Sequence, residues 1–292
     1  LKLWGLKDIC VKVMNEKKLL TIQDISCVGQ CSLTVALPVI SAMGIETAIL
    51  PSAILSTHTG GFTGYTFHDL TEDIPAIKEH WKKENIRFDA FYTGYVGSVK
   101  QLEYISDIMD ELRKPDSIII VDPVMGDKGK LYPGFEPSFA KEMAKLCKKA
   151  DVIVPNLTEA AFMLDEEYIE SGHTKEYIER ILKKLMDLGC KNALLTGVNL
   201  EPGKLGIAAY NGETNEITYY FRDLINGMFH GTGDVFASSF AGAMTLGKSV
   251  DEAGKIAVDF TVDAIAKTID DKSHWYGVKF ELALPELIKS IR

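Results

Sequence analysis

The sequence predicts an α/β fold with a mostly parallel central sheet that is covered by helices on both faces. From Leu19 onward, short apolar runs alternate with segments of helical periodicity, a pattern typical of parallel sheets. The run Ser117–Val121 is apolar throughout its core, as expected for a strand that is buried on both faces. The 292 residues show no internal repeat, low-complexity segment or Pro/Gly/Ser-rich linker, so one domain is the simplest organisation.

The predicted elements cover most of the chain. Strands are expected at Leu19–Ile25, Thr47–Leu50, Ala90–Thr93, Ser117–Val121, Val152–Val154, Ala193–Leu195, Gly206–Tyr210 and Ile217–Phe221. Helices are expected at Ser32–Met43, Asp69–Glu84, Gln101–Leu112, Pro137–Lys148, Thr158–Leu164, Lys175–Leu188, Thr232–Leu246, Val250–Ile269 and Pro285–Ile291. The last two strands are joined through Asn211 and Gly212, which favours an antiparallel hairpin.

Composition and charge argue against several classes of partner. The net charge of −9 disfavours general binding to nucleic acids or anionic membranes. No apolar run approaches the ~20 residues that a membrane span needs. The five cysteines, at positions 10, 27, 31, 147 and 190, are scattered and odd in number, which favours buried free thiols and a reducing, cytoplasmic compartment.

The first residues carry no secretory pattern, because charged side chains interrupt their apolar positions. The chain begins with Leu1, and a methionine follows at position 14. Residues 1–13 are therefore expected to be an N-terminal extension or a tail derived from expression. Residues 14–292 are expected to form the folded domain.

Polar residues follow several of the predicted strands at the point where each strand ends. They occur in the segments Asp24-Ile25-Ser26, Thr93-Gly94-Tyr95, Asp122-Pro123, Pro155-Asn156 and Thr196-Gly197. In open α/β sheets, ligands bind beyond the carboxyl ends of the strands, so a site at this edge can draw on all of these segments.

Residues 242–249, Gly-Ala-Met-Thr-Leu-Gly-Lys-Ser, match the P-loop pattern. A P-loop must follow a strand and open a helix, whereas this segment follows the helical run Val235–Met244. The favoured interpretation is that Gly247 ends one helix and Ser249 caps the next, with Glu252 completing a capping box. Lys248 is then not a phosphate ligand.

The segment Gly231-Thr232-Gly233-Asp234 is a stronger candidate for a phosphate site. Two glycines allow backbone amides to approach a ligand closely, and the apolar helix that follows presents unpaired amides and a positive dipole end. Together they predict an anion hole for a phosphoryl group. The alternative is that Asp234 is simply an acidic residue in the first turn of a helix.

With this segment in place, the sequence resembles a ribokinase-like kinase, and more narrowly a pyridoxal kinase, from about Leu20 to Ala266. The resemblance implies a ribokinase-like domain over residues 14–292. It implies that Asp234 takes the proton from the substrate hydroxyl. It also implies that the amides of Gly231, Thr232 and Gly233 stabilise the transferred phosphoryl group.

Two further motifs carry the resemblance at the nucleotide. Asn156-Leu157-Thr158-Glu159 matches the Asn-x-x-Glu motif, and Asp122-Pro123-Val124-Met125-Gly126-Asp127 matches a stretch that precedes a mobile flap, here Lys128–Gly134. The ATP-binding residues implied are Asp122, Asp127, Tyr132, Asn156, Glu159, Thr196 and Gly233. Asp122 and Glu159 are implied as residues that bind Mg²⁺, and a requirement for a monovalent cation such as K⁺ stays open. The alternative is a strand-end turn at Asp122 and a simple helix cap at Asn156 with Glu159.

The vitamin pocket is implied by Ser56-Thr57-His58-Thr59-Gly60 and by Thr93-Gly94-Tyr95, in which Thr59 and Tyr95 would contact the pyridine ring. The alternatives are a polar turn and a core tyrosine. The sequence departs from the family at Asp24, where many pyridoxal kinases have serine. A carboxylate there can pair with a protonated pyridine nitrogen, unless Asp24 only caps the following turn.

The resemblance therefore implies ATP-dependent phosphorylation of the 5′-hydroxymethyl group of pyridoxal, pyridoxine or pyridoxamine, by a homodimer. A hydroxymethylpyrimidine kinase of the same superfamily is the first alternative. A sugar or nucleoside kinase is disfavoured, because the pocket residues are aromatic and threonine-rich. A non-catalytic vitamin-binding protein is disfavoured because Asp234, Asn156 and Glu159 are all present.

Overall fold

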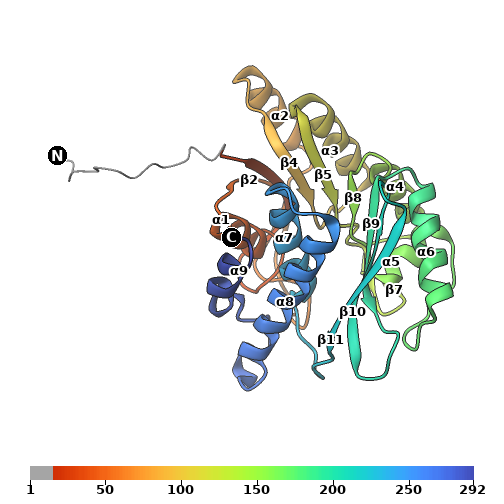
Figure 1. Ribbon diagram of the computed structural model, residues 1–292. Helices are drawn as coiled ribbons and strands as arrows, with labels where there is room; N and C mark the ends of the chain where they lie inside the picture. The colour runs from red at the N-terminus through yellow and green to blue at the C-terminus, as the bar shows by residue number, and fades with distance from the viewer. Residues whose placement is uncertain (1–15) are drawn as a thin grey trace, which may run out of the picture.

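The computed structural model describes residues 16–292, so the predicted tail at 1–13 lies outside the described residues. The predicted α/β fold is confirmed. A nine-stranded sheet runs through the molecule in the order β11-β10-β9-β8-β5-β4-β1-β2-β3 (Figure 1). Its central strands are parallel, whereas β3 and β10 run antiparallel to their neighbours. That residues 14–292 form a single domain stays a prediction.

The strands have the following bounds. The large sheet contains β1 (Lys18–Ser26), β2 (Glu46–Leu55), β3 (Phe67–Asp69), β4 (Phe88–Thr93), β5 (Arg113–Val121), β8 (Val152–Ile153), β9 (Asn192–Val198), β10 (Lys204–Asn211) and β11 (Glu216–Asp223). A separate small hairpin contains β6 (Gly126–Asp127) and β7 (Lys130–Leu131).

The helices form two layers, one on each face of the sheet (Figure 1). One layer contains α1 (Leu33–Ala42), α7 (Thr232–Thr245), α8 (Val250–Thr268) and α9 (Leu284–Ser290). The other contains α2 (Ile74–Lys83), α3 (Val99–Leu112), α4 (Pro137–Cys147), α5 (Leu157–Leu164) and α6 (Lys175–Asp187). Two short 3₁₀ helices, η1 (Lys272–His274) and η2 (Phe280–Leu282), lie between α8 and α9.

Strand β5 shows why the central strands are apolar along their whole length. Ile119 and Val121 pack in the core under α3 to α6, whereas Ile120 between them packs in the core under α1, α7 and α8. Successive side chains of a strand point to opposite faces, so a sheet covered on both sides needs apolar residues at every position. This burial confirms the reading of Ser117–Val121 as a doubly covered strand.

The prediction of a helix over Asp69–Glu84 was wrong at its start. Asp69 ends the edge strand β3, and α2 begins only at Ile74. The Asp69 carboxylate accepts the backbone N–H of Thr71 at 2.6 Å, which stabilises a turn at this point. All three residues of β3 are exposed, so the strand carries no hydrophobic pattern that could reveal it.

The junction of α7 and α8 agrees with the interpretation of the P-loop-like segment as two helix signals. Gly247 has a φ of 86°, the left-handed conformation that commonly ends a helix. Ser249 caps α8, and Glu252 completes the capping box. The segment thus follows a helix rather than a strand.

Within residues 16–292, no helix combines the length and apolar composition needed to cross a membrane.

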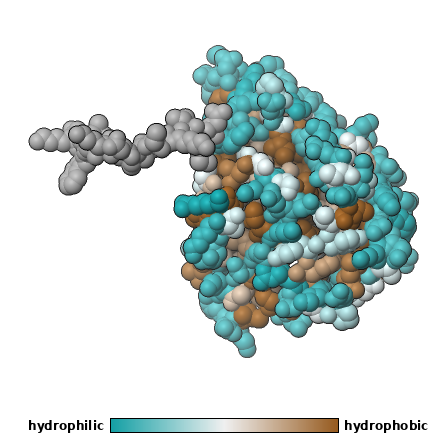
Figure 2. Space-filling model, viewed as in Figure 1, coloured by the Kyte–Doolittle hydropathy of each residue, from teal (hydrophilic) through white to brown (hydrophobic). Residues whose placement is uncertain are grey.

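Cys147 and Cys190 are buried free thiols, as predicted. Cys27 is exposed, which contradicts the prediction for that residue, because it lies in the loop between β1 and α1. Cys10 lies outside the described residues. On the face drawn in Figure 2, hydrophilic side chains cover most of the surface and hydrophobic ones lie in smaller groups among them.

Candidate active site

The carboxyl ends of the parallel strands bring most of the predicted site residues to one edge of the sheet. Asp24 lies in β1, Asp122 directly follows β5, and Thr196 lies in β9. The negative charges of Asp24 and Asp234 act on each other, as do those of Asp122, Glu159 and Asp234, because each raises the pKa of a neighbour. The acids therefore form one electrostatic cluster, although they are far apart in the sequence.

Gly231 begins this site because only glycine fits at its position. Its φ is 75°, and a Cβ atom placed there would lie 1.7 Å from the backbone oxygen of Gln30. Gly233, exposed in the first turn of α7, has no atom of another segment within 4 Å of the position that a Cβ would take. The first turn of α7 therefore faces open space, where its unpaired backbone N–H groups can receive an anion.

Asp234 lies in the same first turn of α7. The pKa of its carboxyl group is raised to about 7: burial and the charge of Asp24 raise it, and the backbone amide of Ser32 and the thiol of Cys31 partly offset this rise. A carboxylate with a pKa near the working pH is well suited to accept a proton. The environment of Asp234 therefore supports a role as a base, beyond that of a first-turn acid.

Asp24 is buried at an irregularity in β1. The pairing of β1 with β2 shifts between Gln23 and Ile25, and such irregularities re-aim a side chain. The Asp24 carboxylate accepts the hydroxyl of Ser26 at 2.9 Å and the hydroxyl of Ser32 at 2.5 Å. Burial nevertheless raises the pKa of Asp24. The pKa of Tyr95 is also raised, mainly by burial and in part by the charge of Asp24, so the two residues lie near each other.

Asn156 and Glu159 form the predicted capping box at the start of α5 and also anchor the loop after β5. Glu159 accepts the backbone N–H of Asn156 at 2.8 Å and that of Met125 at 3.2 Å. The Asn156 side chain donates to the backbone oxygen of Gly126 at 2.8 Å. Burial raises the pKa of Glu159 to about 8. The helix cap and a functional role are therefore compatible.

Asp122 is the least compensated acid of the cluster. It is buried, and among residues 16–292 its carboxylate accepts no side-chain or backbone hydrogen bond. Burial raises its pKa well above the usual range, and the charges of Glu159 and Asp234 raise it further. Two carboxylates that lack a compensating cation fit Mg²⁺, which prefers a few oxygen ligands plus water. The described residues contain no group of three or more side chains placed to hold a metal, so phosphates and water would complete the coordination.

The predicted flap, Lys128–Gly134, begins in the turn of the hairpin β6–β7 and includes β7. Lys128 and Gly129 both have positive φ, 50° and 73°, as in the tight turn that best fits two antiparallel strands. The backbone N–H of Gly129 donates to the Thr158 hydroxyl at 2.9 Å, which fixes the turn against α5. Tyr132 follows the hairpin, and its pKa is raised by burial and by the charges of Glu159, Asp127, Asp234 and Asp122. Tyr132 therefore lies at the rim of the acid cluster, and both Tyr132 and Asp127 are exposed.

Thr59 is exposed, whereas His58 directly before it is buried. His58 accepts the backbone N–H of Gly60 on Nδ1 at 3.0 Å, so Nε2 carries the proton and donates to the backbone oxygen of Tyr276 at 2.7 Å. Phe62 packs edge-on against His58 and lies 4.6 Å from the ring of Trp275. Sequence reasoning missed these aromatic residues, because Trp275 and Tyr276 are more than 200 positions from His58. Their only signal is the polar-aromatic string His274-Trp275-Tyr276.

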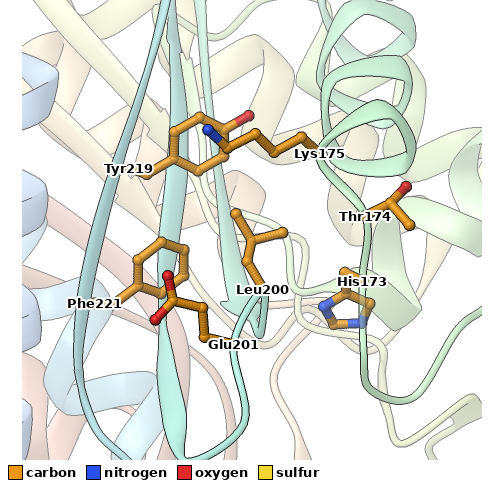
Figure 3. Close-up of a pocket in the computed structure, with 7 residues that line it drawn as sticks. All are labelled: His173, Thr174, Lys175, Leu200, Glu201, Tyr219 and Phe221. Atoms are coloured by element: carbon orange, nitrogen blue, oxygen red, sulfur yellow. The ribbon is translucent and has the colours of Figure 1, made fainter.

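Two cavities lie outside this cluster of acids. One, of about 380 Å³, opens between the start of α6 and β11 and is lined by His173, Thr174, Lys175, Leu200, Glu201, Tyr219 and Phe221 (Figure 3). It contains none of the predicted site residues. A second, of about 320 Å³, lies between Asn226–Phe229 and the segment after α8, directly before the Gly231 turn. The second cavity therefore adjoins the site.

A tuned carboxylate behind a glycine-lined helix start, together with a second acid pair suited to Mg²⁺, defines a small-molecule kinase of the α/β class. The model of the phosphomethylpyrimidine kinase family matches residues 36–278. The chain belongs to this family, and the resemblance to ribokinase-like kinases is confirmed. It is a phosphotransferase that acts on an alcohol group.

Relatives and solved structures agree with this assignment. A pyridoxal kinase from Rubrobacter xylanophilus is 27% identical over 262 residues, which cover 86% of this chain and 87% of the relative. A candidate phosphomethylpyrimidine kinase from Bacteroides thetaiotaomicron, solved with pyridoxal, is 39% identical with a TM-score of 0.88 and covers 93% of this chain and 96% of its own. The pyridoxal kinase from Lactobacillus plantarum is 32% identical with a TM-score of 0.86, over 94% and 97% of the two chains.

Proposed function

We propose that this protein uses ATP to phosphorylate the 5′-hydroxymethyl group of pyridoxal, pyridoxine or pyridoxamine, in the salvage of pyridoxal 5′-phosphate. The observation that carries the proposal is Asp234, whose pKa of about 7 and place beside the Gly231–Gly233 turn suit a base next to a phosphoryl group. The choice of substrate is supported by the pyridoxal kinases among its relatives and by the Bacteroides relative that was solved with pyridoxal.

In the proposed reaction, the hydroxyl oxygen of the vitamer attacks the γ-phosphorus as Asp234 takes the hydroxyl proton. The bond from the γ-phosphorus to the bridging oxygen breaks, and ADP leaves with that oxygen. Such a transfer depends mainly on positioning and on stabilisation of charge. The amides of Thr232 and Gly233 meet the developing negative charge, where one preorganised donor contributes about 3 kcal/mol.

The nucleotide end of the proposed site draws on Asp127, Tyr132, Asn156 and Thr196. Asn156 and Thr196 are adjacent, because they form a bridge that extends the pairing of β8 with β9. Asp122 and Glu159 would hold Mg²⁺, which neutralises phosphate charge when it is bound. The flap around Lys128 would exclude water from the transfer.

The vitamin end of the proposed site contains Asp24, Thr59 and Tyr95. Asp24 would accept a hydrogen bond from a protonated pyridine nitrogen, because opposite charges in contact stabilise each other. We further propose that the protein acts as a cytoplasmic homodimer. Sedimentation of the purified protein tests the dimer, and ADP release in K⁺ against tetramethylammonium buffers tests the need for a monovalent cation.

Hydroxymethylpyrimidine is the second candidate substrate, because the matched family model and the Bacteroides relative both carry a phosphomethylpyrimidine kinase name. A coupled assay of ADP release across pyridoxal, pyridoxine, pyridoxamine and hydroxymethylpyrimidine separates the two. We expect at least one vitamer to be used more efficiently than hydroxymethylpyrimidine. The reverse order would overturn the vitamin B6 assignment, and binding without ADP release would indicate a non-catalytic vitamin-binding protein.

A further inference from the structure

Ser32 has a backbone conformation that serine rarely adopts. Its φ is 55° and its ψ is −133°. Asp165, another residue with positive φ, lies in the ordinary left-handed helical region with a ψ of 46°. Ser32 lies outside that region, in a part of conformational space that is strained for any residue with a Cβ atom. A strained residue persists only where its surroundings hold it, and such residues gather at functional sites.

The strain at Ser32 is not explained by helix capping. Ser32 precedes α1, where a serine side chain normally accepts a backbone N–H of the first turn. Ser98 and Ser249 do so at the starts of α3 and α8, where they accept the N–H groups of Gln101 and Glu252. The Ser32 side chain makes no such bond. Its hydroxyl is therefore free for another purpose.

That hydroxyl donates to Asp24, and the same residue also faces Asp234. The Ser32 hydroxyl lies 2.5 Å from one carboxylate oxygen of Asp24, and Ser26 donates to the other oxygen at 2.9 Å. The backbone amide of Ser32 lowers the pKa of the Asp234 carboxyl group. Ser32 is thus hydrogen-bonded to the acid proposed for the pyridine ring and lies near the acid proposed for the reacting hydroxyl.

The loop that carries Ser32 is packed between two other segments. The backbone oxygen of Gln30 lies against Gly231, where a Cβ would be 1.7 Å away. On its other side, the Gln30 side chain donates to Glu281 at 2.8 Å, and a Cβ at Gly277 would lie 2.3 Å from that of Gln30. These contacts leave the loop little room to relax, so they hold Ser32 in its strained form.

We propose that Ser32 is a positioning residue that fixes the Asp24 carboxylate relative to Asp234 and thereby sets the preference of the kinase for positively charged vitamers. The proposal rests on the function proposed above, in which Asp24 meets the pyridine ring. Ser32 acts through Asp24. A glycine would fit the backbone better, and what the serine adds is the hydroxyl group bonded to Asp24.

The first test is Ser32→Gly, which removes the hydroxyl and relieves the backbone. We expect the midpoint of thermal unfolding to stay level or rise. The KM for pyridoxamine should increase about tenfold, the usual order of effect for losing a hydrogen bond to a charged group. The kcat and the KM for ATP should stay within about threefold, since the nucleotide end and Asp234 keep their backbone contacts. The ratio of kcat/KM for pyridoxamine to that for pyridoxal should therefore fall.

Two matched variants separate positioning from simple destabilisation. Ser32→Ala also removes the hydroxyl but keeps the strained Cβ, so it should lose the same selectivity and unfold at a lower temperature than Ser32→Gly. Ser98→Gly removes a serine that does cap its helix, so it should lower stability and leave the vitamer ratio unchanged. A Ser32→Gly enzyme with the wild-type vitamer ratio would overturn the proposal.

A double-mutant cycle provides the sharpest check, because residues that act through one another are not additive. In an Asp24→Ala background, Ser32→Gly should change the vitamer ratio by less than about twofold. An equal effect in both backgrounds would show that Ser32 does not act through Asp24. If Asp24→Ala does not fold, the ratio in Ser32→Gly alone decides. A wild-type enzyme that phosphorylates no vitamer would contradict the proposed function, whereas an active one with an insensitive Ser32 would contradict only this inference.

Discussion

The two carboxylate pairs of the site differ in how their charges are satisfied, although burial raises the pKa in both. At the vitamin end, Asp24 accepts two hydroxyl groups, and the Ser32 amide and the Cys31 thiol lower the pKa of Asp234. At the nucleotide end, Glu159 accepts two backbone amides, whereas Asp122 accepts none within residues 16–292. The first pair is positioned by the protein itself. The second is short of positive charge, as expected of a site that receives a cation with its nucleotide.

The largest expected effect is at the vitamin end, in Asp234→Asn. Turnover should fall by roughly 10²–10⁴, the usual contribution of a positioned base, while the KM for ATP changes little. Steady-state ADP release measures both quantities. Asp251→Asn, which alters another first-turn acid at the start of α8, serves as the control and should keep near-normal turnover. A similar turnover in the two variants would remove Asp234 from the role of base.

At the nucleotide end, Asp122→Asn should raise the Mg²⁺ concentration for half-maximal activity by about tenfold or more, because one of two acidic ligands is lost. The same change should increase the free energy of unfolding of the metal-free protein by about 1 kcal/mol, since it relieves the repulsion of Glu159 and Asp234 and the cost of ionising a buried acid. Titration of activity with Mg²⁺ and urea unfolding measure the two effects. Asp107→Asn, on the exposed side of α3, is the control. An unchanged Mg²⁺ requirement would show that Asp122 does not bind the metal.

The pH dependence of kcat/KM should report the pKa of Asp234. Because a base works only when deprotonated, kcat/KM should fall as the pH drops through about 7. Asp24→Asn removes a neighbouring negative charge, so it should lower the pKa of Asp234 and move this limb to lower pH. The pKa of Asp234 is 3.8 in the unfolded chain and about 7 in the folded protein. The contribution of Asp234 to the free energy of unfolding is therefore lost as the pH rises from 3.8 to about 7. A limb that stays in place in Asp24→Asn would show that the two acids are not coupled.

The smallest expected effect is at Lys248, which lies in neither pair. Lys248→Ala should leave the KM for ATP within about threefold, less than ~1 kcal/mol, because the residue lies between two helices. A large rise in that constant would show that the P-loop-like segment binds phosphate after all.

The helix starts at Asn156 and at Gly231 could be predicted because their signals are local. A glycine pair before an apolar helix, or Asn156 followed three residues later by Glu159, identifies a helix start within a few positions. The surroundings of Asp24 could not be predicted in this way. Its hydrogen bond with Ser32 depends on how the loop after β1 folds back, and its neighbour His58 comes from a different part of the chain. The strain at Ser32 is a backbone property that no residue pattern predicts. The short strands β3, β6 and β7 were also missed, because they are two or three residues long and largely exposed.

The separate roles of the two carboxylate pairs are tested by competition between equal concentrations of pyridoxamine and pyridoxal, with both phosphorylated products quantified. If Asp24 meets the pyridine ring, Asp24→Ser should lower the ratio of pyridoxamine to pyridoxal product by about tenfold, the effect of losing a charged hydrogen-bond acceptor. Asp122→Asn should leave this ratio at the wild-type value while slowing both reactions. An unchanged ratio in Asp24→Ser, or an equal shift in both variants, would show that Asp24 does not set the vitamer preference.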